Sequence, residues 1–332
     1  MLEHSLIVPD SDDFRFIMSS TQFYMIVYSV IGCVVVAVNV PICCLIYFSK
    51  SLKPSKELIL IGGLCLADTV QALANILSGF QRIILYANGR NELQENSLRC
   101  FVEPFNVLFF FGYHLVGIMT MLVSLDRLVA VLKPMKHDSI FSRRNGIAMT
   151  VATFSFSALA FIFCLFFQIK FQKQMSILCF GSEAYLPAVW EWVHQIRLIP
   201  VLISIAMYLP ISYKLYKITS VHAVGRQQYQ NKKLVNFTKT VGFLSISALI
   251  LIVFPDLLVS YFKKWVGDYE KAMFILAHSK AIVNIFIFTF RHHGLRRTCA
   301  NAAKRFFGYV TGNRVNLVTV SYVHSMRSAD TH

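Results

Sequence analysis

The chain alternates between long apolar stretches and short polar segments. Each of seven stretches is close to the roughly 20 residues that a helix needs to cross a bilayer. They cover residues 22–48, 58–85, 101–125, 146–168, 193–216, 238–262 and 271–290. Because every backbone polar group inside lipid needs a partner within its own segment, stretches of this length indicate helices. The pattern predicts an all-α membrane protein, a seven-transmembrane helix bundle.

The composition supports this interpretation. Of the 332 residues, 56% are hydrophobic and only 15% are charged, whereas a typical soluble domain has about 25% charged residues. A soluble chain would have to bury all seven stretches within one very large core. The composition therefore places the chain in the membrane class.

The basic charge is distributed to one side. The net charge of +15 is compatible with a nucleic-acid partner, but most of the bases follow the first, third, fifth and seventh stretches, which share one side of the membrane. By the positive-inside rule these segments are cytoplasmic and the N-terminus is extracellular. Anionic lipid on the inner leaflet accounts for the excess. We therefore expect contact with membrane lipid and no nucleic-acid partner.

The remaining segments flank the transmembrane domain that is predicted at residues 22–290. Residues 1–21 form the predicted extracellular N-terminus. They are acidic and lack the apolar region of a signal peptide, so we expect the first apolar stretch to act as its own insertion signal. Residues 291–308 place apolar side chains at helical spacing among bases, which predicts a short amphipathic cytoplasmic helix. Residues 309–332 are polar and without periodicity, which predicts a disordered cytoplasmic tail.

Two cysteines differ from the others in their position. Most of the eight cysteines lie inside the apolar stretches, but Cys100 and Cys179 lie on the predicted outer side. Because that compartment is oxidising, we expect a disulfide between them. The chain has no Cys or His spacing typical of a metal site, and we expect neither a metal nor another cofactor.

Several motifs, taken in order, resemble those of one receptor family. They are the LxLAD of the second stretch, SLDRLVAVLKP at the end of the third, a proline in the fifth and the sixth, and NIFIF in the seventh. With the cysteine pair, they resemble the rhodopsin-like (class A) G-protein-coupled receptors over about residues 22–307. The DRLVAV stretch and the NIFIFTFR end of the seventh stretch are most similar to nematode serpentine chemoreceptors of the Srsx type.

The resemblance implies a G-protein coupling and activation switch. Arg127 would contact the G protein in the active state, and Asp126 would restrain it in the inactive state. The further members of the switch would be Tyr208, Pro255, Asn284 and Phe288.

Three positions depart from the family pattern. Val253 stands where the sixth helix usually has Trp, and Ile285 stands where the seventh usually has Pro. Phe288 stands where Tyr is usual, which removes one hydroxyl from the activation network. The departures bear on the activation geometry and not on the fold.

Two charged residues inside the apolar stretches are predicted to meet. The resemblance places Asp68 at the allosteric sodium position of the family and Lys280 beside it. An isolated charge at the membrane centre costs roughly 2.5–3.5 kcal/mol on insertion scales, so pairing is favoured. We expect a buried salt bridge between Asp68 and Lys280, and a receptor that is insensitive to sodium. The alternative is that Lys280 reaches a water-filled cavity unpaired.

The resemblance also implies a ligand pocket nearer the extracellular side. Amine receptors carry an Asp at the position of Phe109, and opsins carry a Schiff-base Lys at the position of His278, so neither class fits. An aromatic floor with an Arg and an Asp suits a small ligand with a polar or anionic end. Alternatively, Arg197 and Asp256 only pair with each other and hold the helices together. The candidate residues are Phe109, Phe110, Tyr113, Arg197, Asp256, Leu257 and His278.

These features together predict a chemosensory receptor in the plasma membrane. It would bind a small molecule or peptide outside and signal to a heterotrimeric G protein inside. A transporter or ligand-gated channel is the alternative, but the chain lacks paired repeats and files of polar residues. An intramembrane hydrolase would need a His or Asp cluster or a Ser-base dyad, which the sequence does not offer, so we expect no enzyme.

Overall fold

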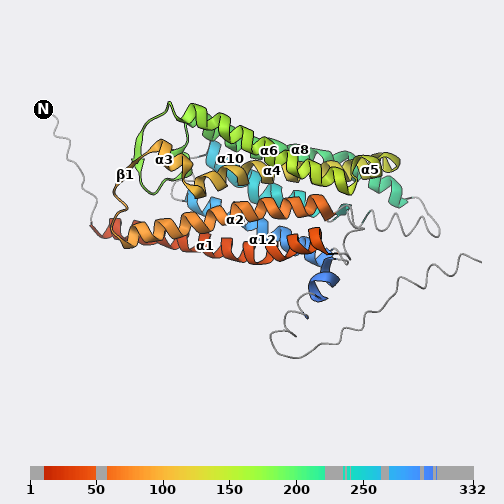
Figure 1. Ribbon diagram of the computed structural model, residues 1–332. Helices are drawn as coiled ribbons and strands as arrows, with labels where there is room; N and C mark the ends of the chain where they lie inside the picture. The colour runs from red at the N-terminus through yellow and green to blue at the C-terminus, as the bar shows by residue number, and fades with distance from the viewer. Residues whose placement is uncertain are drawn as a thin grey trace, which may run out of the picture.

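The computed structural model describes residues 11–49, 58–220, 235, 238–239, 241–262, 269–291, 295–301 and 304. Within the helices, the side chains of residues 11–21 and of several later residues, including Phe288, lie outside this description. The predicted tail at 309–332 also lies outside it, and the predicted amphipathic helix is described only at 295–301 and 304, where it is helical. Within the described part, the chain forms a bundle of long helices that run side by side (Figure 1).

The long helices match the apolar stretches. They are α1 (Ser11–Phe48), α2 (Leu58–Ala87), α4 (Pro104–Leu132), α6 (Arg143–Gln168), α8 (Pro187–Ser220), a helix over 241–261 and α12 (Glu270–Arg291). In the described part, six helices have both the length and the apolar character to cross a membrane, and α12 completes the bundle with 22 residues. The N-terminal helix α1 begins at Ser11, ahead of the apolar stretch that starts at residue 22.

Short elements mark the two ends of the bundle. At one end lie β1 (Gln94–Asn96), α3 (Ser97–Val102), β2 (Gln174–Ser176) and α7 (Gly181–Ala184). The strands β1 and β2 pair antiparallel, with Glu95 opposite Met175. At the other end lies α5 (Pro134–Ile140), which follows α4 directly (Figure 1). We call these the disulfide end, after Cys100 and Cys179, and the Arg127 end.

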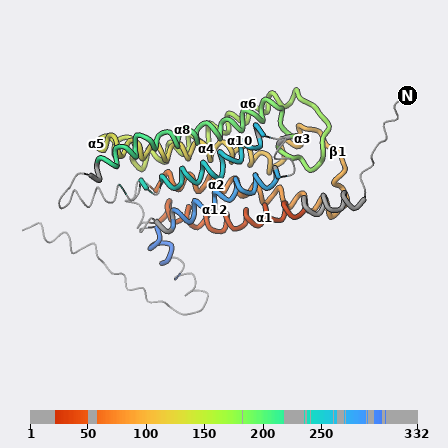
Figure 2. The backbone as a smooth tube through the Cα atoms, turned by 180° about the vertical axis from the view of Figure 1, so that it is seen from behind, coloured from red at the N-terminus to blue at the C-terminus, as the bar shows by residue number. Residues whose placement is uncertain are grey.

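The helix α4 is central to the packing. It contacts α2, α6 and α8, while α1 packs against α2 and α12. The two opposite views agree that α12 lies beside α1 and closes the bundle (Figures 1 and 2). The largest buried cluster draws on α1, α2 and α4, with members such as Ile46, Leu64 and Met119. A separate aromatic cluster near the disulfide end contains Phe101, Phe110 and Tyr185.

A glycine sets the distance between α4 and α8. A Cβ atom on Gly117 would lie 2.9 Å from the Cα and the carbonyl oxygen of Arg197, and as close to the carbonyl oxygen of Ile196. Real Cβ atoms do not approach backbone atoms so closely, so only glycine lets the two backbones touch here, as small residues do in many membrane helix pairs. The contact brings Arg197 directly against α4.

The helix over 241–261 is irregular in its middle. Its regular part at 241–248 gives way to a π-helical segment, η1 (Leu249–Val253), before α10 (Phe254–Tyr261) begins. Pro255 follows immediately, and a proline lacks the N–H that an α-helix would use and clashes with the carbonyl four residues earlier. A π turn at such a point is a common form of helix distortion. The irregularity therefore lies directly ahead of Pro255.

Candidate functional site

A disulfide fixes the loop between α6 and α8 to α3, the short helix that precedes α4. Cys100 and Cys179 are bonded, with 5.2 Å between their Cα atoms, across a separation of 79 residues. This confirms the predicted pair. The amide nitrogen of Asn106 donates to the carbonyl oxygens of both cysteines, at 2.7 and 3.3 Å. Tyr185 donates to the Asn106 carbonyl at 2.8 Å, and burial raises the pKa of its hydroxyl above the ordinary value.

Arg82 anchors the same loop from α2. Its Nε donates to the Leu178 carbonyl at 2.9 Å and its Nη2 donates to the Cys179 carbonyl at 3.2 Å. The guanidinium also lies over the rings of Phe180 and Phe105, with 4.4 and 5.3 Å to the ring centroids. Arg82 was not among the residues predicted from the sequence. Its signal was a charge near the end of an otherwise apolar stretch, which calls for a polar partner.

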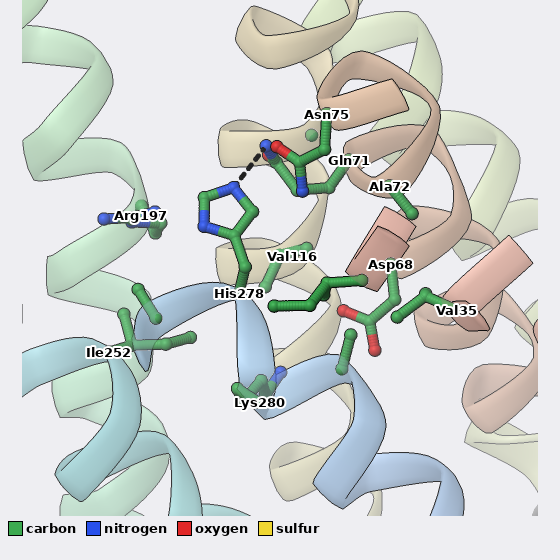
Figure 3. A pocket seen from close by; sticks show the side chains of 14 residues that line it. Val35, Asp68, Gln71, Ala72, Asn75, Val116, Arg197, Ile252, His278 and Lys280 are labelled. Carbon is green, nitrogen blue, oxygen red and sulfur yellow. Dashed lines mark hydrogen bonds between the residues drawn. The ribbon is translucent and has the colours of Figure 1, made fainter. Parts of the chain in front are cut away.

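A cavity that several polar side chains line, called the polar cavity below, lies between α1, α2, α4, α8, η1 and α12. Its volume is about 30 Å³, counted as the space open to the centre of a water-sized sphere. The polar side chains that line it come from three of these helices, and Figure 3 shows how they surround it. They are Asp68, Gln71 and Asn75 of α2, Arg197 of α8, and His278 and Lys280 of α12.

The predicted salt bridge between Asp68 and Lys280 is not formed. Asp68 instead accepts a hydrogen bond from the Asn284 amide at 2.9 Å. The Lys280 side chain is 2% exposed, and its Nζ has no hydrogen-bond partner among the described residues. Both side chains line the same cavity (Figure 3). The expectation was wrong because Asn284, one helical turn from Lys280, forms the hydrogen bond to the Asp68 carboxylate. The arrangement corresponds to the alternative, in which Lys280 is unpaired at a cavity.

Arg197 and Asp256 form a bidentate ion pair. The Arg197 Nε donates to one carboxylate oxygen at 3.0 Å and Nη2 contacts the other. Both residues are about 95% buried, and the guanidinium also stacks over Tyr113 with 4.0 Å to the ring centroid. Paired hydrogen bonds of this kind hold a guanidinium in one orientation. The pair joins α8 to α10, as the structural alternative anticipated.

The other pocket candidates divide into two groups. His278 lines the cavity. The ring of Phe109 lies edge-on to the His278 ring, with 6.3 Å between their centroids. Phe110 is fully buried elsewhere, because one step along the helix turns it toward Phe161 of α6 and Trp192 of α8. It also stacks on His114 of its own helix. Leu257 is 36% exposed and does not line the described cavity. Neither Phe110 nor Leu257 therefore contributes to the described cavity.

His278 uses both ring nitrogens. Its Nδ1 lies 2.6 Å from the Phe274 carbonyl, which requires Nδ1 to donate. Its Nε2 lies 3.3 Å from the amide nitrogen of Gln71, which requires Nε2 to accept. One donor and one acceptor are the roles of a neutral imidazole. The ring therefore brings hydrogen-bonding capacity to the cavity but no charge.

A serine cluster lies between this cavity and the Arg127 end. Ser124 and Ser204 are 2.6 Å apart, and Ser204 and Ser245 are 3.5 Å apart, so hydroxyls from three helices meet. The cluster borders a second cavity of about 10 Å³, which Lys280 and Asn284 also line. The hydroxyl of Tyr208 is buried without a partner among the described residues, and the side chain of Phe288 lies outside them.

The Asp126 and Arg127 pair lies within α4 rather than at its end. Both residues are buried, and the Arg127 Nε donates to Asp126 at 2.7 Å. The second carboxylate oxygen of Asp126 is 2.8 Å from Nε2 of His137, on α5. The His137 ring stacks on the buried Phe141 with 5.7 Å between centroids. Asp126 is thus held from both sides, and the sequence analysis had not assigned a role to His137.

The chain has seven apolar stretches, a disulfide between α3 and the loop after α6, and a buried acid-arginine pair. Together these features define a membrane receptor of the seven-helix class. A family model described as 7 transmembrane receptor (rhodopsin family) matches residues 38–292. The chain belongs to this family, which confirms the predicted fold class. Its members are receptors rather than enzymes, bind ligands from outside the cell and signal through G proteins. No curated protein matches the chain.

Proposed function

We propose that the chain is a chemosensory receptor of the plasma membrane that couples to a heterotrimeric G protein through the Arg127 end. The observation that carries the proposal is the buried Asp126 and Arg127 pair, which His137 closes from the other side. The finer assignment, a serpentine chemoreceptor of the Srsx type, rests on the DRLVAV stretch and the NIFIFTFR end of α12. The ligand is a small molecule or a peptide.

The disulfide end faces outward in this proposal. A disulfide persists in an oxidising compartment, and Cys100 and Cys179 are joined at that end. Most of the Lys and Arg residues between the apolar stretches fall at the opposite end, which the positive-inside rule assigns to the cytoplasm. The N-terminus is then extracellular, and Arg127 lies at the cytoplasmic face.

Ligand binding shifts the balance between an inactive and an active arrangement of the helices. In the inactive arrangement Asp126 holds Arg127, so the guanidinium is not free to meet a partner. Lys280 lines both the polar cavity and the smaller cavity beside the serine cluster. A ligand that displaces Lys280 therefore changes the surroundings of Ser124 and Ser245, on two helices that pack near Arg127.

The experiment replaces Arg127 by alanine and measures nucleotide exchange on a promiscuous G protein in cell membranes. We expect exchange to fall more than tenfold, both without ligand and with pools of small volatile, acidic and peptide compounds. The control is Arg144→Ala, since Arg144 is an exposed base at the start of α6. Cell-surface amounts are measured for each variant. Undiminished exchange in Arg127→Ala would mean that coupling does not pass through Arg127. An ion current without any G-protein exchange would move the assignment to a channel or transporter.

A second prediction concerns the restraint on Asp126. Replacing His137 by phenylalanine keeps a ring against Phe141 but deletes the nitrogen that meets Asp126. A hydrogen bond to a charged group contributes about 1.5–3 kcal/mol, so we expect ligand-independent exchange to rise about tenfold. The control is Met135→Ala, because Met135 is on the same short helix and is 93% exposed. Unchanged exchange in His137→Phe would mean that Asp126 restrains Arg127 without help from α5.

A further inference from the structure

The polar cavity holds one carboxylate and one ammonium group that do not touch. One carboxylate oxygen of Asp68 accepts a hydrogen bond from Asn284, and the other oxygen accepts none from the described residues. Lys280 is buried, and its Nζ has no partner in the same part of the chain. Unpaired charged groups in a protein interior are costly. A group that accepts a hydrogen bond from Lys280 and donates one to Asp68 would remove both deficits at once.

The charges that face the cavity sum to zero. Arg197 is neutralised by Asp256, and His278 has the hydrogen-bonding pattern of a neutral ring. Gln71 and Asn75 add amides without charge. Lys280 and Asp68 then balance each other. An ammonium or carboxylate group that entered the cavity would leave one buried unit charge without compensation, whereas a neutral group would not.

The size and the apolar lining restrict the group further. A volume of about 30 Å³ open to the centre of a water-sized sphere is small, so the cavity suits a compact head group rather than a bulky one. The rest of the lining is aliphatic and suits a short hydrocarbon chain. It is made by Ile31, Val35, Val116, Ile252 and Ala277.

We propose that the cavity binds the neutral polar head of a small aliphatic ligand, an amide or an alcohol. The oxygen of the head accepts a hydrogen bond from the Lys280 ammonium, and its N–H or O–H donates to the free oxygen of Asp68. The aliphatic part of the ligand lies against the apolar lining. This inference rests on the proposed receptor function and names the chemical class of its ligand.

The test uses three compounds with the same chain and different heads: pentanamide, pentanoate and pentylamine. The purified full-length receptor in lipid nanodiscs is titrated with each compound, and its thermal unfolding temperature is recorded. We expect saturable stabilisation by pentanamide, with an apparent affinity at least tenfold higher than for pentanoate or pentylamine. The wild-type comparison needs no variant, so it stands even where a substitution impairs folding.

Two substitutions should reverse the selectivity. Lys280→Met leaves Asp68 uncompensated, so pentylamine should become the preferred compound. Asp68→Asn leaves Lys280 uncompensated, so pentanoate should become preferred. Each variant should bind pentanamide at least fivefold more weakly. The control is Leu77→Ala, because Leu77 lies on α2 with 43% of its surface exposed, and it should keep the wild-type order.

The outcomes separate the ligand class from receptor function. Equal or stronger stabilisation by pentanoate or pentylamine, no stabilisation by pentanamide, or an unchanged order in both charge variants would overturn the inference. G-protein nucleotide exchange is measured in the same nanodiscs. Selective pentanamide binding without exchange would support the cavity inference and contradict the coupling proposal. Exchange driven by pentanoate or pentylamine would support the coupling proposal and contradict the cavity inference.

Discussion

Replacing Arg197 by alanine lowers the stability of the folded receptor by about 3–5 kcal/mol, because it leaves the Asp256 carboxylate buried without its partner. The two side chains make a bidentate contact at about 5% exposure. The substitution also removes the guanidinium from the Tyr113 ring. Thermal unfolding in nanodiscs measures the loss. The double variant Arg197→Met with Asp256→Leu should recover most of it, since buried ion pairs are often replaceable by apolar residues.

The control is an exposed ion pair in the same molecule. Arg99 contacts Glu95 at 2.8 Å, but its side chain is 69% exposed. Arg99→Ala should therefore change the stability by no more than about 1 kcal/mol. If Arg197→Ala cost as little as Arg99→Ala, Asp256 would have another source of compensation. If the double variant were as unstable as Arg197→Ala, the loss would come from packing and not from the unpaired carboxylate.

Loss of the disulfide is the second large effect. Replacing Cys100 by serine should lower stability by about 2–5 kcal/mol, because the bond closes a long loop whose ends are 79 residues apart. Cys179 has a φ of 48°, a left-handed conformation that a non-glycine residue rarely adopts. Without the bond, the segment that Arg82 and Asn106 hold can relax away from this conformation. Thermal unfolding before and after reduction measures the effect.

Reduction provides its own control. The wild-type protein should lose stability in reductant, whereas Cys100→Ser should not change further. Cys33→Ser should behave as wild type, since Cys33 is a free and exposed cysteine. Equal unfolding temperatures for wild type and Cys100→Ser would mean that the hydrogen bonds of Arg82 and Asn106 alone hold the loop.

The helices could be predicted from the sequence because the bilayer imposes one length and one polarity on every crossing segment. Their ends were less accessible. The helix α4 continues past the predicted end at residue 125 to Leu132, because an ion pair that neutralises itself can stay helical and buried. The chain then turns at Lys133 before Pro134, and a residue before proline avoids helical geometry. The β1–β2 pairing was missed because strands of three residues leave no alternating pattern.

The candidate site could be predicted only where one residue's chemistry implied its partner. The cysteine pair and the pair of Arg197 with Asp256 were of that kind, although the second had two possible roles. Phe109 and Phe110 are adjacent, and only the rotation of α4 decides which ring contacts His278 and which contacts His114. For Asp68, the sequence offered two plausible partners on α12, and the hydrogen bond forms with the amide of Asn284 rather than with Lys280. His137 was missed because only the turn after α4 brings it back to Asp126.

The π-helical segment between residues 249 and 253 has a mechanical consequence. Each residue of an α-helix turns the chain by about 100°, and the π turn inserts an extra residue ahead of Pro255. If this turn became α-helical, the part that carries Ser245 would rotate by about that angle relative to the part that carries Asp256. The ion pair of Arg197 and Asp256 would hold the α10 part of the helix in place. The helix over 241–261 can therefore rotate about its own axis at the Arg127 end of the bundle while α10, at the other end, keeps its position.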